Sequence, residues 1–385
     1  MPWRETCAMN ERMRFIVAAE AGTESMSELC RQFGIARKTG YKWRARFAAD
    51  GPAGLADRPR VARERPHALS REMRELVLGL RGEHPTWGPR KLVALLMRTY
   101  PGIAPPAPST VGDLLREAGL TVPRRRRRHV PPRTAPLAHA TGPNVVWCAD
   151  FKGDFALGDG SRCYPLTISD AHTRYLLRCQ ALPRTTTARV QPLFEATFRE
   201  FGLPEVIRTD NGPPFASTAA GGLSALSVWW VKLGIRPERI DPGKPSQNGR
   251  HERMHRTLKA EACVPAADSP RAQQRRFDQF RETYNHVRPH EALGQVPPGE
   301  VHTPSLRTFP SRPLELTYPE ADRVTRVRRN GCIRWRGTEV YVAQSLATES
   351  VGLTLVDDHH WEVVFGPLRL GTFRAGMTRL RPPQP

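Results

Sequence analysis

The stretch VVWCADF at residues 145–151 decides the fold, because it is an apolar, β-prone run with an acid near its end. Such a run predicts a buried strand, and Asp150 within it is costly to bury unless a cation accompanies it. A second acid, Asp210, follows the apolar run VIRT at residues 206–209. A third, Glu252, begins a helix-compatible segment after a loop rich in Pro, Gly and Ser.

Three carboxylates that converge repel one another and resist ionisation unless hard cations lie among them. Oxygen ligands suit Mg²⁺ or Mn²⁺. Two such ions about 4 Å apart can stabilise both the attacking and the leaving oxygen of a phosphoryl displacement. The sequence therefore predicts that Asp150, Asp210 and Glu252 bind two Mg²⁺ or Mn²⁺ ions and that the substrate is a phosphodiester.

Other acids compete for these roles. Asp154, four residues along the same strand, would lie about 13 Å from Asp150. Asp170 and Asp241 have the sequence surroundings of turn residues. Glu261 would lie about two and a half helical turns beyond Glu252. We therefore expect none of the four to belong to the metal site.

The charge balance of the chain favours a polyanionic partner. Its 385 residues include 59 Lys and Arg against 38 Asp and Glu, a formal net charge of +21. Nucleic acid is the leading candidate and a membrane surface the lesser one. A hydrophobic content of 39% permits folded cores and argues against a disordered chain. Seven cysteines without a Cys-x-x-Cys pair indicate reduced thiols rather than a disulfide framework.

Residues 7–50 have the spacing of a helix-turn-helix. Helices are expected at 12–20, at 26–33 after the capping sequence SMSE, and at 36–47 beyond the break at Gly34. On the third segment we expect contacts to DNA from Arg37, Lys38, Tyr41 and Lys42. Gly40 in the middle of that helix would cost about 1 kcal/mol. A plain helical bundle with a solvated basic face is the alternative.

A second helical unit is expected after a linker rich in Pro, Gly and Arg, with helices at 70–81, 90–98 and 110–118. An uninterrupted basic run follows, made of Arg124, Arg125, Arg126, Arg127 and Arg128. We expect this run to be an arm that binds the DNA backbone, because closely packed like charges need counter-anions. A solvated tether is the alternative.

The central part of the chain alternates strand and helix patterns. Strands are expected at 145–157, 162–169, 174–182, 204–210 and 235–240, with helices at 185–201 and 223–233 and a third that carries Glu252. His255, Arg256 and Lys259, three, four and seven positions after Glu252, would share its helical face. Arg256 and Lys259 would contact DNA phosphates there.

The C-terminal part alternates short β-prone runs with turns between residues 323 and 373, and Asn330-Gly331 has the sequence of a hairpin turn. The number of runs predicts a small β-barrel.

Four motifs together carry a family resemblance. They are WCADF (147–151), TDNGPPF (209–215), NGRHER (248–253) and YNHVRPHEAL (284–293). In this order, between Gly142 and Glu300, they resemble the DDE transposases of bacterial insertion sequences, which have a retroviral-integrase-type core. The sequence WGPRKL (87–92) is similar to the second helix-turn-helix of these proteins.

The resemblance implies a ribonuclease-H-like α/β core in a multidomain chain. The expected domains are a helix-turn-helix (1–50), a linker (51–68), a second helix-turn-helix-like unit (69–122), an Arg/Pro-rich linker (123–141), the catalytic core (142–300), a linker (301–320) and the small β-barrel (321–378). It also implies that Asp150 bridges both metal ions while Asp210 and Glu252 each hold one.

The implied activity is metal-dependent cleavage of the ends of a mobile element and strand transfer into target DNA. Double-stranded DNA would be the substrate, and two ends in one complex imply a homodimer or a higher assembly. We expect a cytoplasmic, nucleoid-associated bacterial protein without a membrane partner, because the sequence has no apolar run of about 18 residues and no leader pattern. A phage or retroelement-type integrase, or a DNA-binding regulator with a vestigial core, are the alternatives.

Overall fold

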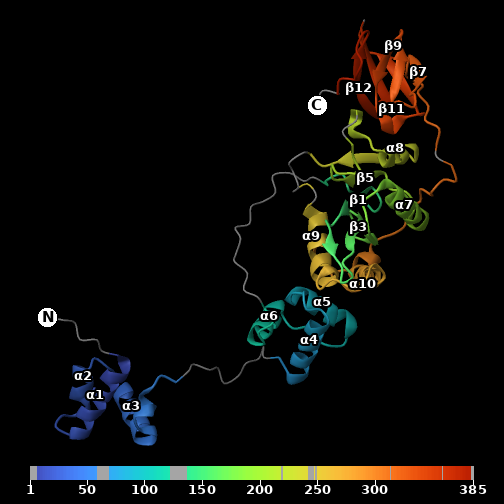
Figure 1. Cartoon of the computed structure of the whole chain (residues 1–385). Coiled ribbons are helices and arrows are strands. Elements are labelled where there is room, and N and C mark those ends of the chain that lie inside the picture. Colours follow the sequence, from blue (N-terminus) through green and yellow to red (C-terminus); the bar gives the residue numbers. More distant parts are fainter. Residues whose placement is uncertain are drawn as a thin grey trace. The chain divides into compact units, whose positions relative to one another are not determined.

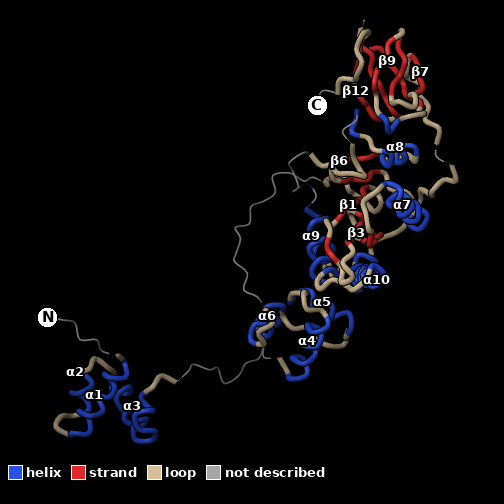
Figure 2. The backbone as a smooth tube through the Cα atoms, viewed as in Figure 1, coloured by secondary structure: helices blue, strands red, loops and turns tan. Residues whose placement is uncertain are grey.

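The computed structural model describes residues 7–58, 69–121, 137–217, 220–241, 247, 249–312, 314–357 and 359–382. The chain divides into two compact units, Met1–Ala68 and Leu69–Pro385. The first unit contains helices, and the second contains helices and sheets (Figure 1 and Figure 2). None of the helices in the described ranges is long and apolar enough to cross a membrane.

The first unit is a three-helix domain, as the sequence predicted. Its helices are α1 (Ala8–Ala21), α2 (Met26–Gln32) and α3 (Arg37–Asp50). The Ser25 hydroxyl caps α2 by accepting a hydrogen bond from the Glu28 backbone N–H at 3.3 Å. Gly40 is buried where α3 crosses the other two helices, and a Cβ there would lie 2.5 Å from Cys30 Sγ and 2.9 Å from Phe15 Cζ. The residue that lowers the helix propensity of α3 thus permits its close packing.

The second helical module, residues 69–121, has its own core within the second unit. It comprises α4 (Arg71–Glu83), α5 (Pro89–Thr99) and α6 (Pro108–Glu117), close to the ranges predicted from the sequence. Trp87, Leu92, Leu96 and Val111 are almost fully buried between the three helices.

A mixed sheet forms the centre of the second unit. Its strands are β1 (Val146–Phe151), β2 (Phe155–Ala156), β3 (Arg162–Asp170), β4 (Leu176–Leu182), β5 (Val206–Thr209) and β6 (Arg236–Arg239). The order β2-β3-β1-β5-β6, with β4 also paired to β3, places β1 between the antiparallel and the parallel halves. β1 runs antiparallel to β3 and parallel to β5, and β5 runs parallel to β6. The strand carrying Asp150 is therefore central.

Helices cover both faces of this sheet: α7 (Thr187–Phe201), α8 (Ala225–Lys232), α9 (Gly249–Leu258) and α10 (Pro270–Glu282). Trp147 and Ala149 of β1 pack into the core shared with α7 and α8. Since successive strand residues point to opposite faces, Asp150 points away from α7 and α8. That is the face on which α9 lies, because His255 of α9 comes within reach of Asp150.

The C-terminal strands do not confirm the small barrel. They are β7 (Arg323–Arg326), β8 (Cys332–Trp335), β9 (Thr338–Tyr341), β10 (Ser350–Leu355), β11 (His360–Phe365) and β12 (Leu368–Arg374). In the described residues they form an open four-stranded sheet, β12-β11-β10-β7, and a separate hairpin, β8-β9. The outer strands β7 and β12 are not paired with each other. The hairpin instead packs on the sheet through Ile333, Trp335 and Val340, which share one core with Val351 and Phe365.

Candidate active site

Asp150 and Asp210 lie side by side because neighbouring parallel strands carry them to the same level. β1 and β5 pair with Val146 opposite Val206 and Cys148 opposite Arg208. Continued by two residues, this register brings Asp210 level with Asp150, and neighbouring strands are about 4.8 Å apart. The backbone N–H of Gly212 donates to Asp210 Oδ1 at 3.2 Å, which fixes this side chain just beyond the end of β5.

Electrostatics link all three predicted acids. Burial, together with the negative charges of Asp210 and Glu252, raises the pKa of Asp150 to about 7. Burial also raises the pKa of Asp210, against the opposing effect of the Gly212 N–H. The charges of both other acids thus act on Asp150.

Glu252 lies in the first turn of α9, and its side chain is exposed. The helix turns His251, Met254, His255 and Leu258 toward the sheet. Most of the Gly- and Pro-containing loop before Glu252, residues 242–246 and 248, lies outside the described residues.

Two buried histidines of α9 form a polar cluster beside Asp150. His251 Nε2 and His255 Nε2 each lie 2.7 Å from Thr167 Oγ1. Ser169 Oγ lies 3.1 Å from His251 Nδ1. Thr167 stands opposite Asp150 in the β1–β3 ladder, and its hydroxyl donates to the Asp150 carbonyl oxygen at 3.1 Å. His255 Nδ1 lies 3.8 Å from Asp150 Oδ2, so the cluster reaches the carboxylate itself.

The histidines supply no positive charge to the acids. Burial lowers the pKa of His251 to about 3, and burial with the neighbouring His251 lowers the pKa of His255 to about 2. The Lys152 charge and a backbone N–H of Phe151 act against the raised pKa of Asp150. Carboxylate oxygens are the donors that Mg²⁺ and Mn²⁺ prefer. The residues present fit a divalent cation.

A second group of ligand-type side chains overlaps this one at Asp150. In the described residues, Asp150, His251 and His255 offer ligand atoms within 4.8 Å of one another. Both histidines, however, already share the Thr167 hydroxyl. We therefore assign them to holding β1, β3 and α9 together around Asp150.

The predicted DNA-contacting residues that the structure describes are exposed. Arg37, Lys38, Tyr41 and Lys42 lie on the surface of α3, while the next residue, Trp43, is buried. Arg256 is exposed on α9, and Lys259 is exposed just beyond its end, in a π-helical turn (Lys259–Cys263). The predicted arginine arm, Arg124 to Arg128, lies outside the described residues.

Sequence reasoning missed the part played by His251 and His255. It placed His255 on the same exposed face as Glu252, whereas the structure buries it against β3. A signal was present, because positions 251, 254, 255 and 258 have the spacing of the buried stripe of a helix. Only the apolar members, Met254 and Leu258, would normally be assigned to that stripe.

Family models match most of the chain in pieces. Residues 140–245 and 233–298 match two models of an integrase core domain. Residues 11–63 match a helix-turn-helix domain, and residues 39–115 match a homeodomain-like domain.

Two curated relatives are bacterial insertion-element proteins. The chain is 33% identical over 222 residues to the Insertion element IS476 uncharacterized 39.2 kDa protein of Xanthomonas euvesicatoria, covering 56% of this chain and 60% of that protein. It is 34% identical over 189 residues to the Insertion element IS407 uncharacterized 31.7 kDa protein of Burkholderia multivorans, covering 49% of this chain and 66% of that protein. The chain thus spans less than two thirds of these relatives' lengths.

Among solved structures, the HTLV-2 integrase catalytic core domain in complex with magnesium (trimeric form) aligns at 16% identity. The alignment covers 42% of this chain and 98% of that chain, with a TM-score of 0.34. In sequence, the chain is similar to insertion-element proteins of bacteria. Together with the family models, this similarity identifies a chain with an integrase core domain at residues 140–298, preceded by helix-turn-helix domains that imply DNA binding.

Proposed function

We propose that this protein is a DDE transposase that cleaves the ends of a mobile element and joins them to target DNA. The observation that carries the proposal is the pairing of β1 with β5, which brings Asp210 level with Asp150, beside the helix α9 that carries Glu252. The integrase core models, which cover all three acids, and the helix-turn-helix models before them support the same activity.

In this proposal Asp150, Asp210 and Glu252 are the metal ligands and the catalytic residues. Asp150, on the central strand, would serve both ions, and Asp210 and Glu252 would each serve one. When bound, two Mg²⁺ or Mn²⁺ ions would supply Lewis acidity to the attacking and leaving oxygens of a phosphodiester. The chain's own part is to hold the three carboxylates in place on a rigid sheet and one helix.

The neutral His251 and His255 position this site rather than react. Through Thr167 they connect α9 to β3, and β3 is hydrogen-bonded to β1 alongside Asp150. Because α9 also carries Glu252, these contacts set the distance between Glu252 and the two aspartates.

Strand transfer needs no nucleotide cofactor, because one phosphodiester bond is broken for each one that is formed.

We also propose that the protein acts as a homodimer or higher assembly on DNA, since two element ends must be joined to one target. The exposed basic residues of α3 would contact the ends, as would the arginine arm.

The proposal includes the domain boundaries set out above, which divide the chain into two helical modules, a core and a C-terminal β domain.

The test is Asp210→Asn in the full-length protein, assayed for Mg²⁺-dependent joining of labelled element ends to a plasmid. We expect joining to be lost, by at least about 100-fold, because Asp210 would hold one of the ions, and such electrostatic stabilisation of a transition state is typically worth that much. Binding of the ends should persist. Asp278→Asn is the matched control: Asp278 is on α10, exposed, and accepts a hydrogen bond from Gln274 that an amide oxygen can keep.

Joining by Asp210→Asn at the rate of the control would contradict the assignment. A wild-type protein that binds the ends but never cuts them would instead favour the regulator with a vestigial core.

A further inference from the structure

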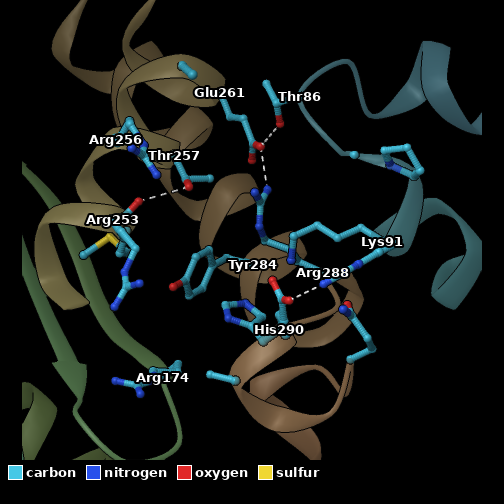
Figure 3. Close-up of a pocket in the computed structure, with 18 of the residues that line it drawn as sticks. Thr86, Lys91, Arg174, Arg253, Arg256, Thr257, Glu261, Tyr284, Arg288 and His290 are labelled. Carbon is cyan, nitrogen blue, oxygen red and sulfur yellow. Dashed lines mark hydrogen bonds and ion pairs between the residues drawn. The ribbon is translucent and has the colours of Figure 1, made fainter. Parts of the chain in front are cut away.

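A second candidate site lies between the second helical module and the core, in a cavity of about 1100 Å³ (Figure 3). One wall is formed by the turn before α5 and by the first residues of α5 and α6. The facing wall is formed by α9 and by residues 284–295, after α10. None of Asp150, Asp210 and Glu252 lines it, so the cavity is separate from the candidate active site.

The lining of the cavity is strongly basic. Eight of its residues are lysine or arginine and two are glutamate. Both glutamates are already engaged: Glu261 Oε1 pairs with Arg288 at 2.6 Å, and Glu291 Oε1 pairs with Arg90 at 2.5 Å. Figure 3 shows Glu261 between Thr86 and Arg288 at one side of the cavity. Each glutamate already has one arginine partner, and the lining cations outnumber the two glutamates.

Five arginines lack such a partner. In the described part of the chain, no carboxylate forms an ion pair with Arg81, Arg174, Arg250, Arg253 or Arg256. The Arg174 and Arg250 guanidinium groups both donate to the Ala171 carbonyl oxygen, at 2.8 and 3.2 Å, which brings two like charges together. Burial and the nearby Arg250 lower the pKa of Arg174 to about 10. The protein thus gathers cations here that repel one another.

The module adds positive potential from its backbone. Gly88 and Pro89 line the cavity at the start of α5, and Pro108 and Ser109 line it at the start of α6. Neither helix has a side-chain hydrogen bond at its N-cap. Each helix N-terminus carries roughly half a positive charge, so it attracts an anion. Two helix ends and a cluster of arginines therefore surround the same space.

Lys91 joins the two walls. Its Nζ donates to the Pro289 carbonyl oxygen of the core, and burial and the nearby Arg288 lower its pKa to about 8. Figure 3 shows Lys91 and Arg288 entering the cavity from opposite sides. An anion placed between them would relieve their mutual repulsion.

We propose that this cavity binds the phosphate backbone of one DNA strand and thereby joins the second helical module to the core on the element's DNA. The choice of DNA rests on the proposed function. A DNA strand carries one negative charge for each nucleotide, so its successive phosphates suit a surface with several arginines. The volume is close to the upper end of the range of small-ligand pockets, about 300–1,000 Å³. It therefore accommodates a few nucleotides of one strand and not the full width of a duplex.

The experiment compares two charge-removing double variants of the full-length protein. The α9 variant combines Arg253→Ala with Arg256→Ala and removes two cations from the cavity wall. The α10 variant combines Arg271→Ala with Arg275→Ala. It removes the same number of positive charges from exposed positions of α10 that do not line the cavity. Lys91→Met removes the cation of the opposite wall and keeps the aliphatic stem. Thermal unfolding verifies that each variant is folded.

The measurement is DNA affinity at several salt concentrations, in Ca²⁺, on a duplex with a single-stranded 3′ extension. Each lost phosphate contact should reduce the slope of log affinity against log salt by about 0.7–0.9. We expect a reduction of about 1.4–1.8 for the α9 double variant, about 0.7–0.9 for Lys91→Met, and close to none for the α10 variant. Uncharged methylphosphonates in a short run of one strand should weaken wild-type binding and leave the α9 variant unaffected.

Equal slopes for the α9 and α10 double variants would overturn the proposal. A second result would also overturn the proposal. If the α9 variant bound polyglutamate more weakly than the wild type but bound DNA equally well, the partner of the cavity would be an acidic protein. Because this assay measures binding and not joining, a protein that shows the expected slopes but never transfers strands would refute the proposed function alone. Strand transfer with equal slopes would refute only the cavity.

Discussion

Replacing Asp150 by Asn should stabilise the metal-free protein while abolishing its activity. The Asp150 side chain is 17% exposed and its pKa is raised from 3.8 to about 7. A carboxyl group whose pKa is raised on folding destabilises the folded state once the pH exceeds its unfolded value, and the cost is complete above the folded value. The difference of about 3 pH units corresponds to at most about 4 kcal/mol, since one unit is worth 1.36 kcal/mol.

The expected gain for Asp150→Asn at pH 8 is smaller, about 1–3 kcal/mol, because relaxation and water reduce the cost of a partly exposed charge. At about 2–4 °C per kcal/mol for a domain of this size, the unfolding temperature should rise by roughly 2–12 °C. Below pH 7 the wild-type carboxyl becomes protonated in the folded state, so at pH 5 the advantage of the variant should fall to less than half.

The assay is thermal unfolding in EDTA at pH 5 and pH 8, repeated with Mg²⁺. Mg²⁺ should raise the unfolding temperature of the wild type and have little effect on Asp150→Asn, because the variant lacks the central ligand. Asp278→Asn should match the wild type in every condition. A lower unfolding temperature for Asp150→Asn in EDTA at pH 8, or an equal response of both proteins to Mg²⁺, would refute the reasoning.

Two further predictions concern packing and hydrogen bonding. Gly40→Ala should destabilise α3 by up to about 2 kcal/mol, since overpacking costs about 1–3 kcal/mol against a helix-propensity gain of about 1. Gly79→Ala, in α4 with open space around its Cβ, should stabilise by up to about 1 kcal/mol. Hydrogen exchange in the full chain compares the two variants. Equal signs for the two glycines would contradict the packing argument. Thr167→Val should cost about 2–4 kcal/mol in urea unfolding, because it leaves nitrogens of His251 and His255 buried without a partner, whereas Thr167→Ser should keep most of the stability. A valine variant as stable as the serine one would show that the cluster does not hold the site together.

The sequence predicted the helices and central strands well, because their periodicity is strong. The helices expected at 70–81 and 90–98 correspond to α4 and α5, and the capping residue Ser25 stands where it was expected. The C-terminal domain was less predictable, since strand runs do not state which edges meet. There the β8-β9 hairpin turns at Arg336 and Gly337, both with positive φ, and not at Asn330-Gly331, which forms a turn before β8.

The acids of the site could be found from the sequence because each follows a recognisable local pattern. What lies between them could not. His251 and His255 matter through Thr167, which is more than 80 residues away in the chain. The basic cavity likewise depends on Lys91 and Arg253, which belong to separate modules and come together only through tertiary packing.

The parallel pairing of β1 with β5 has a consequence for how the chain tolerates changes in length. The turn at Gly158–Gly160 lies in the segment between the first two acids, yet an insertion there leaves the ladder of β1 and β5 untouched. Removing a single residue from within β5 would instead rotate everything after it to the opposite side of the sheet and carry Asp210 away from Asp150. Natural variation should therefore accumulate in the connections, while the four residues of β5 keep a constant count.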